Sequence, residues 1–397
     1  MDSAEREGLR PKGNVPNLRF PEFQGEWEKT KFGDIAIVVG GGTPDTNTSQ
    51  YWNGKIQWFT PSEIGRKKYV YNSVRTISEE GLNKSSAKLL PIGTILLSSR
   101  ATVGECSINK KECTTNQGFQ SLIPKENISN EFVYYLIQTK RKDLIRKSCG
   151  STFLEISANE VRKIVISIPT IKEQDNIANV LSLLDERIAT QNKIIEDLKK
   201  LKSAIIEIEY TPNTKTTSHI GNVIEQISKR NKNNAIQNVL SVSNRQGFIK
   251  QSDQFENRNV ASEDTSNYKI VEKNDFAFNP ARINVGSIAR LTTFEKGIVS
   301  PMYICFRTQE NVAPEYIDFF FESKHFYCEI QKRLEGSVRQ CLSFEGLCNI
   351  PFSLPSLEMQ QRIGKRLFTL GQKIKTETDL LELLNKQKQY LLRQMFI

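Results

Sequence analysis

The sequence contains one helical pattern twice, and this repeat limits the folds that the chain can adopt. ISIPTIKEQDNIANVLSLLDERI (166–188) matches FSLPSLEMQQRIGKRLFTLGQKI (352–374) when the chain is shifted by 186 residues. In both copies a proline precedes Thr170 or Ser356, and a hydroxyl at that place caps a helix by accepting backbone N–H bonds. Because proline favours an extended residue before it, each copy predicts a strand that turns into a helix.

Apolar residues then recur at alternating spacings of four and three in both copies. The mean spacing of about 3.5 residues is the period of a coiled-coil seam. Polar residues interrupt the two seams at matching places, where Gln191 aligns with Glu377 and Lys202 aligns with Lys388. Cap, seam and interruptions agree at one offset, which disfavours two unrelated amphipathic helices. The predicted seam residues are Ile177, Leu181, Leu184, Ile188, Ile195, Leu198, Ile363, Leu367, Leu370, Ile374, Leu381 and Leu384.

The segments that precede the two helices are also related. KLLPIGTILLSSRATVG (88–104) resembles KIVEKNDFAFNPARINVG (269–286), with Arg100 opposite Arg282. Short β-like runs broken by Gly, Asn and Pro, with one or two short helices in each copy, indicate the α+β class. We therefore predict two copies of a globular domain followed by a long helix. The predicted boundaries are a tail at 1–20, a first domain at 21–169, a central helix at 170–208, a second domain at 209–355 and a C-terminal helix at 356–397.

The predicted helices have a length that suits DNA recognition. The central helix would span about 54 Å at 1.5 Å per residue, and two-fold DNA readers place their domains roughly 34–36 Å apart, one turn of the duplex. Two such helices paired antiparallel would fix the spacing between two reading domains as a ruler does. The two globular sequences differ more than the two helices do, which predicts two different half-sites.

The composition restricts the possible partners and compartments. A net charge of +10 favours a polyanionic partner such as nucleic acid. No apolar run is long enough to predict a membrane span, and the N-terminal residues lack the apolar core of a signal peptide. Seven cysteines without a CxxC pair fit free thiols in a reducing cytosol.

The motifs expected of a catalytic chain are missing. GGGT (40–43) is not followed by the rest of a phosphate-binding GxxxxGK[ST] loop, and neither an FxGxG loop nor a [DN]PP[YF] tetrad of adenine methylases is present. Asp45 with Glu63 resembles part of a metal-dependent nuclease site, but Gly65 stands where a lysine is needed. Two histidines offer little acid–base chemistry. We therefore expect a chain without catalytic residues, a bound metal or a cofactor.

The residues that suit DNA contact lie in the globular segments. Phosphate binding needs Lys and Arg, whereas base reading needs forked donors and amides. Arg100 and Arg282 each precede a glycine expected to shape a loop, and each could either bind a guanine or phosphate or brace a turn. Packing is the better interpretation for the aromatic group of Tyr51, Trp52 and Trp58. The candidate contact residues are Thr43, Tyr51, Lys55, Ser62, Arg66, Lys67, Lys68, Arg100, Thr102, Asn116, Gln117, Ser243, Asn244, Arg245, Arg282 and Asn284.

The chain resembles the DNA specificity subunits of type I restriction–modification systems over essentially its whole length. The second copy departs from the first, with SLEMQQ in place of TIKEQD and SPMYI in place of NQGFQ. The motifs that carry the resemblance are WEKTKFGDIA (27–36), GGGTPDTNTSQYWNGKIQWFTPSEI (40–64), SSRATVG (98–104), NQGFQ (116–120) and the helix start IPTIKEQDNIANVLSLLDERI.

The resemblance implies two pseudo-symmetric α/β target-recognition domains separated by two long helices that form an antiparallel coiled coil. It implies that each domain reads one half of a split site in double-stranded DNA. It further implies two methyltransferase subunits that dock on the helices, bind S-adenosylmethionine and methylate adenine at N6, and restriction subunits that use ATP and Mg²⁺. The implied location is the bacterial cytoplasm, with the nucleoid. The alternative functions are a coiled-coil scaffold that binds only proteins, and a stand-alone nuclease or methylase.

Overall fold

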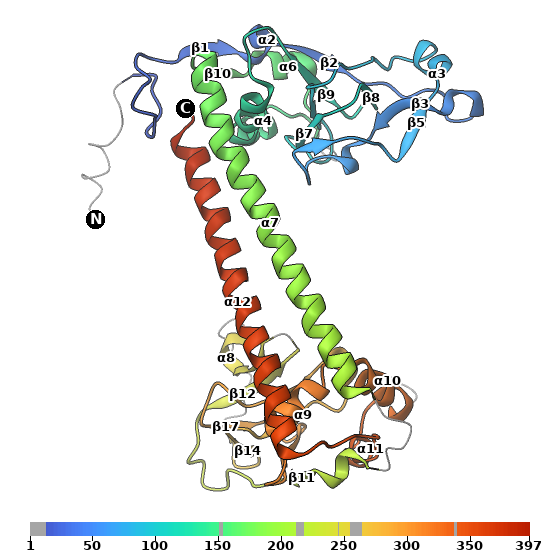
Figure 1. Cartoon of the computed structure of the whole chain (residues 1–397), viewed down its shortest axis with the longest axis vertical. Coiled ribbons are helices and arrows are strands. Elements are labelled where there is room, and N and C mark those ends of the chain that lie inside the picture. Colours follow the sequence, from blue (N-terminus) through green and yellow to red (C-terminus); the bar gives the residue numbers. More distant parts are fainter. Residues whose placement is uncertain (1–12, 151–153, 212–217, 245, 255–263, 337–339) are drawn as a thin grey trace. The chain divides into compact units, whose positions relative to one another are not determined.

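The computed structural model describes residues 13–150, 154–211, 218–244, 246–254, 264–336 and 340–397. The chain folds as two compact units: unit 1 comprises Met1–Thr190 with Leu381–Ile397, and unit 2 comprises Gln191–Leu380. Two long helices, α7 (Ile171–Tyr210) and α12 (Leu357–Gln394), each contribute one end to each unit (Figure 1). The remaining part of each unit is globular, and we call it domain 1 in unit 1 and domain 2 in unit 2.

Domain 1 mixes short strands with short helices. Its elements are β1 (Glu28–Lys31), α2 (Phe32–Ile35), β2 (Ala36–Gly40), η1 (Ser49–Tyr51), β3 (Trp52–Phe59), η2 (Pro61–Glu63), β4 (Tyr69–Val70), β5 (Arg75–Ile77), α3 (Glu79–Asn83), β6 (Ile95–Leu97), β7 (Cys106–Asn109), β8 (Cys113–Thr115), β9 (Gln120–Pro124), α4 (Asn130–Thr139), α5 (Arg141–Arg146), α6 (Ala158–Lys163) and β10 (Val165–Ile168). One sheet has the strand order β2-β9-β6-β7-β4 and a second has the order β5-β3-β8, while β1 pairs with β10.

Domain 2 is built from the same kinds of element. They are η3 (Ile220–Asn222), β11 (Ile224–Ile227), β12 (Val239–Ser243), β13 (Gly247–Lys250), α8 (Gln251–Gln254), β14 (Lys269–Glu272), β15 (Phe276–Phe278), η4 (Ile283–Val285), β16 (Ile288–Arg290), β17 (Lys296–Val299), β18 (Ile304–Thr308), α9 (Pro314–Phe320), α10 (Lys324–Arg333) and α11 (Phe344–Cys348). Its two sheets have the orders β11-β18-β15-β16 and β13-β12-β17-β14.

The two domains share one topology, which confirms the repeat seen in the sequence. The order β2-β9-β6-β7 in domain 1 corresponds to β11-β18-β15-β16 in domain 2. In the second sheet of each domain, one inner strand runs antiparallel to one neighbour and parallel to the other, as β3 does with β5 and β8 and β12 does with β13 and β17. The predicted α+β class is therefore confirmed, with most strand pairs antiparallel.

The core of unit 1 includes residues from the start of α7 and from the end of the chain. The ring of Phe396, just beyond α12, stacks on Phe132 of α4 with 5.2 Å between centroids and meets Trp27 edge-on at 6.4 Å. Ile177 and Leu181 of α7 belong to the same buried cluster. Since full burial of one large apolar side chain contributes about 1.5–3 kcal/mol, the last residues of the chain are an integral part of the first domain.

Unit 2 buries the opposite ends of the two helices. Tyr210, at the end of α7, packs on Tyr316 of α9 with 4.8 Å between ring centroids and donates a hydrogen bond to its carbonyl at 2.6 Å. Ile363 and Leu367, from the first turns of α12, lie in the same cluster. Each unit therefore encloses the start of one long helix and the end of the other.

The long helices are antiparallel where they meet. In unit 2, Gln191 donates to the carbonyl of Glu377 at 2.9 Å, and Glu209, further along α7, lies 3.7 Å from Arg366, which is earlier on α12. In unit 1, the last turns of α12 share a core with the first turns of α7. Every predicted seam residue is buried or partly buried, as packing of two apolar stripes requires. No helix in the described ranges could span a membrane.

A buried glutamine fixes the start of each long helix to its domain in the same way. Gln174 donates to the carbonyl of Pro169 at 2.9 Å and accepts the N–H of Ser129, the residue before α4, at 3.0 Å. Gln360, its counterpart on α12, makes the same two contacts with Pro355 and Ala313, both at 2.9 Å. Both glutamines are 1% exposed. The glutamine of the repeated helix start is thus a structural residue that joins two elements in each copy.

The prediction of an N-terminal tail at 1–20 needs correction. Residues 1–12 lie outside the described ranges, but Leu18 donates its N–H to the carbonyl of Gln394 at 2.9 Å. The guanidinium of Arg19 forms two 2.8 Å contacts with the carboxylate of Glu173, which also accepts from the indole N–H of Trp27 at 3.2 Å. Because Glu173 is 1% exposed, this part of the predicted tail neutralises a buried charge and belongs to unit 1.

Candidate nucleic-acid interface

Several predicted contact residues of domain 1 lie on loops that touch one another. The Thr43 hydroxyl donates a hydrogen bond to the side-chain oxygen of Gln117. The loop of Arg100 adjoins the same turn, because the N–H of Ser99 donates to the carbonyl of Gly118 at 2.8 Å. Arg100 and Gln117 are exposed, and Thr43 is partly exposed. Residues distant in the sequence therefore form one polar surface.

The turn that carries Ser62 joins this surface from a third side. A Cβ atom added to Gly118 would come within 2.9 Å of the Pro61 ring, so the two turns are in close contact. The Thr60 hydroxyl donates to the Glu63 carboxylate at 2.7 Å and lies 3.0 Å from the Ser62 hydroxyl. The Glu63 carboxylate thus stabilises its own turn. This structural role accounts for Glu63 without a nuclease site.

Two tryptophans support the glycine-rich loop. The indole N–H of Trp58 donates to the carbonyl of Gly42 at 2.9 Å, and that of Trp52 donates to the carbonyl of Asp45 at 3.0 Å. The two rings meet edge-on at 5.1 Å, and the Arg75 guanidinium lies 3.5 Å from the Trp52 ring centre. Both indoles are buried. The packing interpretation is confirmed for them, and Tyr51 packs against the same cluster.

The predicted basic contacts differ in accessibility. Lys55, Arg66 and Lys67 are exposed. The Lys68 side chain is 9% exposed, and its ammonium contacts Glu131 and the hydroxyl of Ser182. Since a phosphate could reach Lys68 only after these contacts were broken, the expectation of DNA contact is corrected for this residue. Thr102 and Asn116 have local partners, the Ser98 hydroxyl at 3.0 Å and the Gly118 N–H at 2.9 Å.

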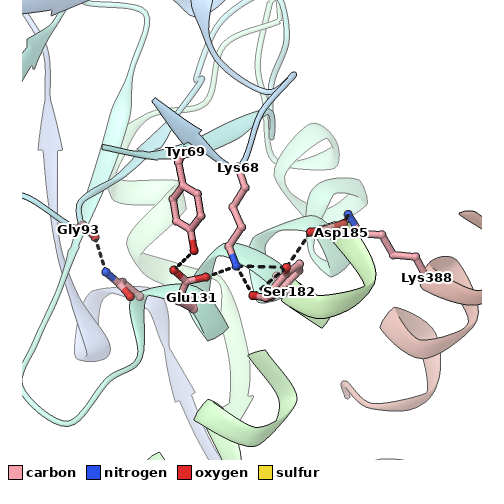
Figure 2. A network of polar contacts seen from close by, with 9 residues as sticks. Lys68, Tyr69, Gly93, Glu131, Ser182, Asp185 and Lys388 are labelled. Carbon is pink, nitrogen blue, oxygen red and sulfur yellow. Dashed lines mark hydrogen bonds and ion pairs between the residues drawn. The ribbon is translucent and has the colours of Figure 1, made fainter. Parts of the chain in front are cut away.

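Lys68 belongs to a polar junction between domain 1 and the long helices (Figure 2). Tyr69 donates to the carboxylate of Glu131, which also pairs with Lys68. The Tyr135 hydroxyl donates to Asp185 of α7 at 2.7 Å, and Asp185 pairs with Lys388 of α12 at 2.7 Å. Burial raises the pKa of the Tyr135 hydroxyl, so it stays protonated and donates.

Unit 2 has a counterpart of this junction. Lys202 lies 5.1 Å from the ring centre of Phe319 and pairs with Glu322 at 2.6 Å. Lys388 lies 5.8 Å from the ring centre of Tyr135 in unit 1. The lysines that interrupt the two seams at equivalent places therefore hold equivalent positions over an aromatic ring of α4 or α9.

The glycines expected to shape the arginine loops do so in both domains. Gly104 has φ of +87° and Gly286 has φ of +85°, a left-handed conformation that glycine adopts without steric cost. Arg100 precedes Gly104 by four residues, and Arg282 precedes Gly286 by four residues. The Arg100 Nε lies 2.8 Å from a carboxylate oxygen of Glu155.

Domain 2 brings three of its predicted contact residues, Ser243, Asn244 and Arg282, together at a small pocket of about 40 Å³. Ser243 and Asn244, at the end of β12, face the loop of Arg282 there. Asn284 lies in η4 of the same loop and is partly buried. Arg245 lies outside the described ranges. The pocket is lined by Val242, Ser243, Asn244, Arg282, Val285 and Ser287.

A basic cavity of about 760 Å³ lies in domain 2 away from the predicted contact residues. Lys229, Arg230 and Lys232 come from the basic run SKRNKN (228–233), whereas Lys296 comes from β17. The basic run was recognisable in the sequence, so part of this surface could be predicted. The sequence did not predict that Lys296 belongs to this surface, because only the fold brings β17 beside that run.

Two equivalent α/β domains with unlike polar loops, each attached to a pair of antiparallel long helices, define the class of this protein. The family model described as "Type I restriction modification DNA specificity domain" matches residues 24–200 and again 206–386. The chain therefore belongs to the type I restriction–modification DNA specificity family.

Curated relatives carry names that agree with this family. The chain is 41% identical over 180 residues to the type I restriction enzyme MjaIX specificity subunit of Methanocaldococcus jannaschii, covering 44% of this chain and 42% of that protein. It is 32% identical over 190 residues to the EcoR124I/EcoR124II specificity subunit of Escherichia coli, covering 46% of each. These two alignments therefore span less than half of either relative. A putative MjaX specificity subunit aligns over 95% of this chain at 25% identity.

Solved structures show the same fold. The crystal structure of the type I restriction–modification S subunit from M. genitalium matches with a TM-score of 0.60 and 16% identity, covering 96% of this chain and 99% of that one. A chain from a structural study of complex assembly and conformational transition of the type I system matches with a TM-score of 0.57 and 15% identity, covering 94% and 97%.

Proposed function

We propose that the chain binds double-stranded DNA and selects the site at which a type I restriction–modification complex acts. Domain 1 contacts one half of a split, asymmetric site and domain 2 contacts the other half. Exposed Lys and Arg side chains supply salt-dependent affinity for phosphates. Side chains near Thr43, Gln117 and Arg100 in domain 1, and near Asn244 and Arg282 in domain 2, supply base contacts.

The observation that carries this proposal is the contrast between a shared framework and unlike loops. Four strands of one sheet keep the same order in both domains, β2-β9-β6-β7 and β11-β18-β15-β16. The polar residues differ, because domain 1 brings Thr43 and Gln117 into contact, whereas domain 2 has a pocket lined by Asn244 and Arg282. A framework kept twice with two different polar surfaces suits the recognition of two different half-sites.

In this proposal, the antiparallel helices set the number of base pairs between the half-sites and bind two methyltransferase subunits. Large apolar side chains outside the seam support the second role, because exposed apolar surface marks sites of protein association. Leu183, Leu383 and Tyr390 are exposed by 65%, 61% and 58% in unit 1, and Ile208 and Phe368 by 76% and 52% in unit 2.

The chain itself is proposed to hold no cofactor and to catalyse no reaction. S-adenosylmethionine belongs to the methyltransferase subunits, which methylate adenine at N6, and ATP with Mg²⁺ belongs to the restriction subunits. The complex is proposed to work on DNA in the bacterial cytoplasm, at the nucleoid. A purified chain that alone cleaved or methylated DNA would contradict this assignment.

Methylation-aware sequencing of a host that carries the chain with its methyltransferase subunits tests the proposal directly. We expect modified adenines within one split motif, and we expect this motif to vanish when the chain is deleted. Modified adenines without a split motif would contradict recognition by two domains. Binding of duplex DNA by the assembled complex, measured across a salt series, separates this function from a protein-only scaffold, for which no binding is expected even at low salt.

A second experiment tests the role of the helices. Four residues are inserted into α7 and into α12 at equivalent positions, which adds about one turn or roughly 6 Å to each helix. The expected result is a longer spacer between unchanged half-sites. The matched control substitutes four exposed residues of each helix without changing its length. An unchanged spacer in the lengthened variant would contradict the role of the helices as a ruler.

A further inference from the structure

We propose that Arg100 reads a guanine in the half-site of domain 1 and that Glu155 is a positioning residue that orients the Arg100 guanidinium. This inference rests on the proposed function and assigns it a base and two named residues. It also distinguishes Arg100 from Arg282, which the sequence places at a similar point in the second copy.

The ion pair holds one edge of the guanidinium and leaves the other edge available. The Nε atom of Arg100 lies 2.8 Å from a carboxylate oxygen of Glu155, and the two side chains are 45% and 42% exposed. Within the described part of the chain, neither terminal nitrogen of Arg100 donates a hydrogen bond to the protein. Those two nitrogens form the fork that binds O6 and N7 of guanine in the major groove.

The charge of the pair favours a base over a phosphate. The carboxylate neutralises the guanidinium, so the pair as a whole gains little from the negative field of the DNA backbone. A carboxylate at 2.8 Å would also repel an approaching phosphate. The forked donors keep their geometry, and two parallel hydrogen bonds to a guanine edge depend on geometry more than on net charge.

The backbone around Arg100 is held in place from several sides. Arg100 and Glu155 face each other in an antiparallel bridge, and the N–H of Ile156 donates to the carbonyl of Ser99 at 3.0 Å. The Ser98 hydroxyl donates to the Arg100 carbonyl at 2.9 Å. Ala101 has φ of +57°, a left-handed conformation that a non-glycine residue keeps only where its surroundings enforce it. Such enforced geometry is what a base-reading side chain requires.

Domain 2 provides an internal comparison that lacks the positioning carboxylate. The N–H of Leu342 donates to the carbonyl of Pro280 at 3.0 Å, as Ile156 does to Ser99 in domain 1. The residue before Leu342 is Cys341, which bridges Glu335 as Glu155 bridges Cys149. A thiol thus stands where domain 1 has a carboxylate. Arg282 also lies one residue further from this bond than Arg100 does, and it lines the pocket of Asn244.

The test measures base discrimination by the complete complex with its methyltransferase subunits. Duplexes carry every single base-pair change in the half-site of domain 1, and binding is compared for the parent chain, Arg100→Ala, Arg100→Lys, Glu155→Ala and Glu155→Gln. We expect Arg100→Ala to lower discrimination at one G·C pair by about 5- to 150-fold, the equivalent of one forked contact. Arg100→Lys should lose most of it too, because an ammonium has no fork.

Variants of Glu155 distinguish positioning from simple structural support. Glu155→Ala should lower discrimination at the same base pair, while Glu155→Gln should retain more of it, because its amide places an oxygen beside Nε at the same side-chain length. All discrimination in the other half-site should stay unchanged. Arg282→Ala is the matched control, and its effects should be confined to the half-site of domain 2.

Two results would overturn the inference. One is an Arg100→Lys complex that assembles and discriminates as the parent does at every position. The other is tighter binding of Glu155→Ala to all sequences with unchanged discrimination, which would make Glu155 a competitor of DNA. If the parent complex recognised no split site at all, the proposed function itself would fail, and this outcome is distinct from both.

Discussion

Gln191 of α7 donates a hydrogen bond at 2.9 Å to the carbonyl of Glu377 of α12, the residue that occupies the equivalent position in the other copy. The amide also contacts the Glu377 carboxylate. Equivalent residues of two antiparallel helices meet only at the midpoint of their pairing. The two side chains are 5% and 9% exposed. A buried polar pair within an apolar seam selects one register, because any shift would leave the Gln191 amide without its Glu377 partners.

Substituting Gln191 alone should destabilise the chain. Gln191→Leu removes the two contacts that its amide makes with the carbonyl and the carboxylate of Glu377, so the free energy of unfolding should fall. The double variant Gln191→Leu with Glu377→Leu should regain stability, because it replaces both polar groups by apolar ones, but it should lose the preference for one register. Chemical denaturation measures the first effect, and methylation-aware sequencing should return more than one spacer for the double variant. A single spacer would contradict the register role.

The same pair predicts a pH dependence. The Lys373 ammonium and then the Gln191 amide lower the pKa of the Glu377 carboxyl. A carboxyl whose pKa is lower in the folded chain contributes stability above its unfolded pKa of about 4.3, and the contribution is lost as the pH falls through the folded value. The free energy of unfolding of the parent, compared with Glu377→Gln between pH 3 and 6, should show a steeper loss in the parent at the acid end. Parallel curves would contradict this contribution.

The two buried glutamines at the starts of the long helices should have equal importance. Gln174→Ala and Gln360→Ala each remove one donor and one acceptor from buried backbone partners. We expect a loss of about 1–3 kcal/mol in the free energy of unfolding for either variant. Gln361→Ala changes an exposed neighbour and serves as the matched control. A much smaller effect at one glutamine than at the other would show that the starts of α7 and α12 are not equivalent.

One of the differences between the starts of the two long helices lies at Glu173, and its structural cause can be tested. Glu173 aligns with Met359, and only Glu173 meets an N-terminal segment with an arginine, Arg19. Glu173→Met should cost about 3 kcal/mol, because it strands one member of a mostly buried ion pair. Adding Arg19→Met should restore part of the loss. Thermal unfolding measures both, and equal stability of the parent and Glu173→Met would contradict the role of this ion pair.

The sequence by itself determined the duplicated plan. The 186-residue offset, the helix caps and the apolar spacing of about 3.5 residues are linear patterns, and helix geometry converts them directly into a face. The turn-forming glycines after Arg100 and Arg282 could be predicted for the same reason, because a turn depends on residues close in the chain. The short helices of each domain could also be predicted from local spacing. The breaks between α4 and α5, near Lys140, and between α9 and α10, near Ser323, could not.

Only the tertiary structure decided which distant groups became partners. It placed Lys68 in the polar junction, Phe396 in the core of the first domain and Glu155 beside Arg100. It also placed Arg19, from the expected tail, in contact with the buried carboxylate of Glu173. These contacts join residues far apart in the sequence, and whether a charged side chain faces solvent or a buried partner depends on how whole elements pack, which no local pattern records.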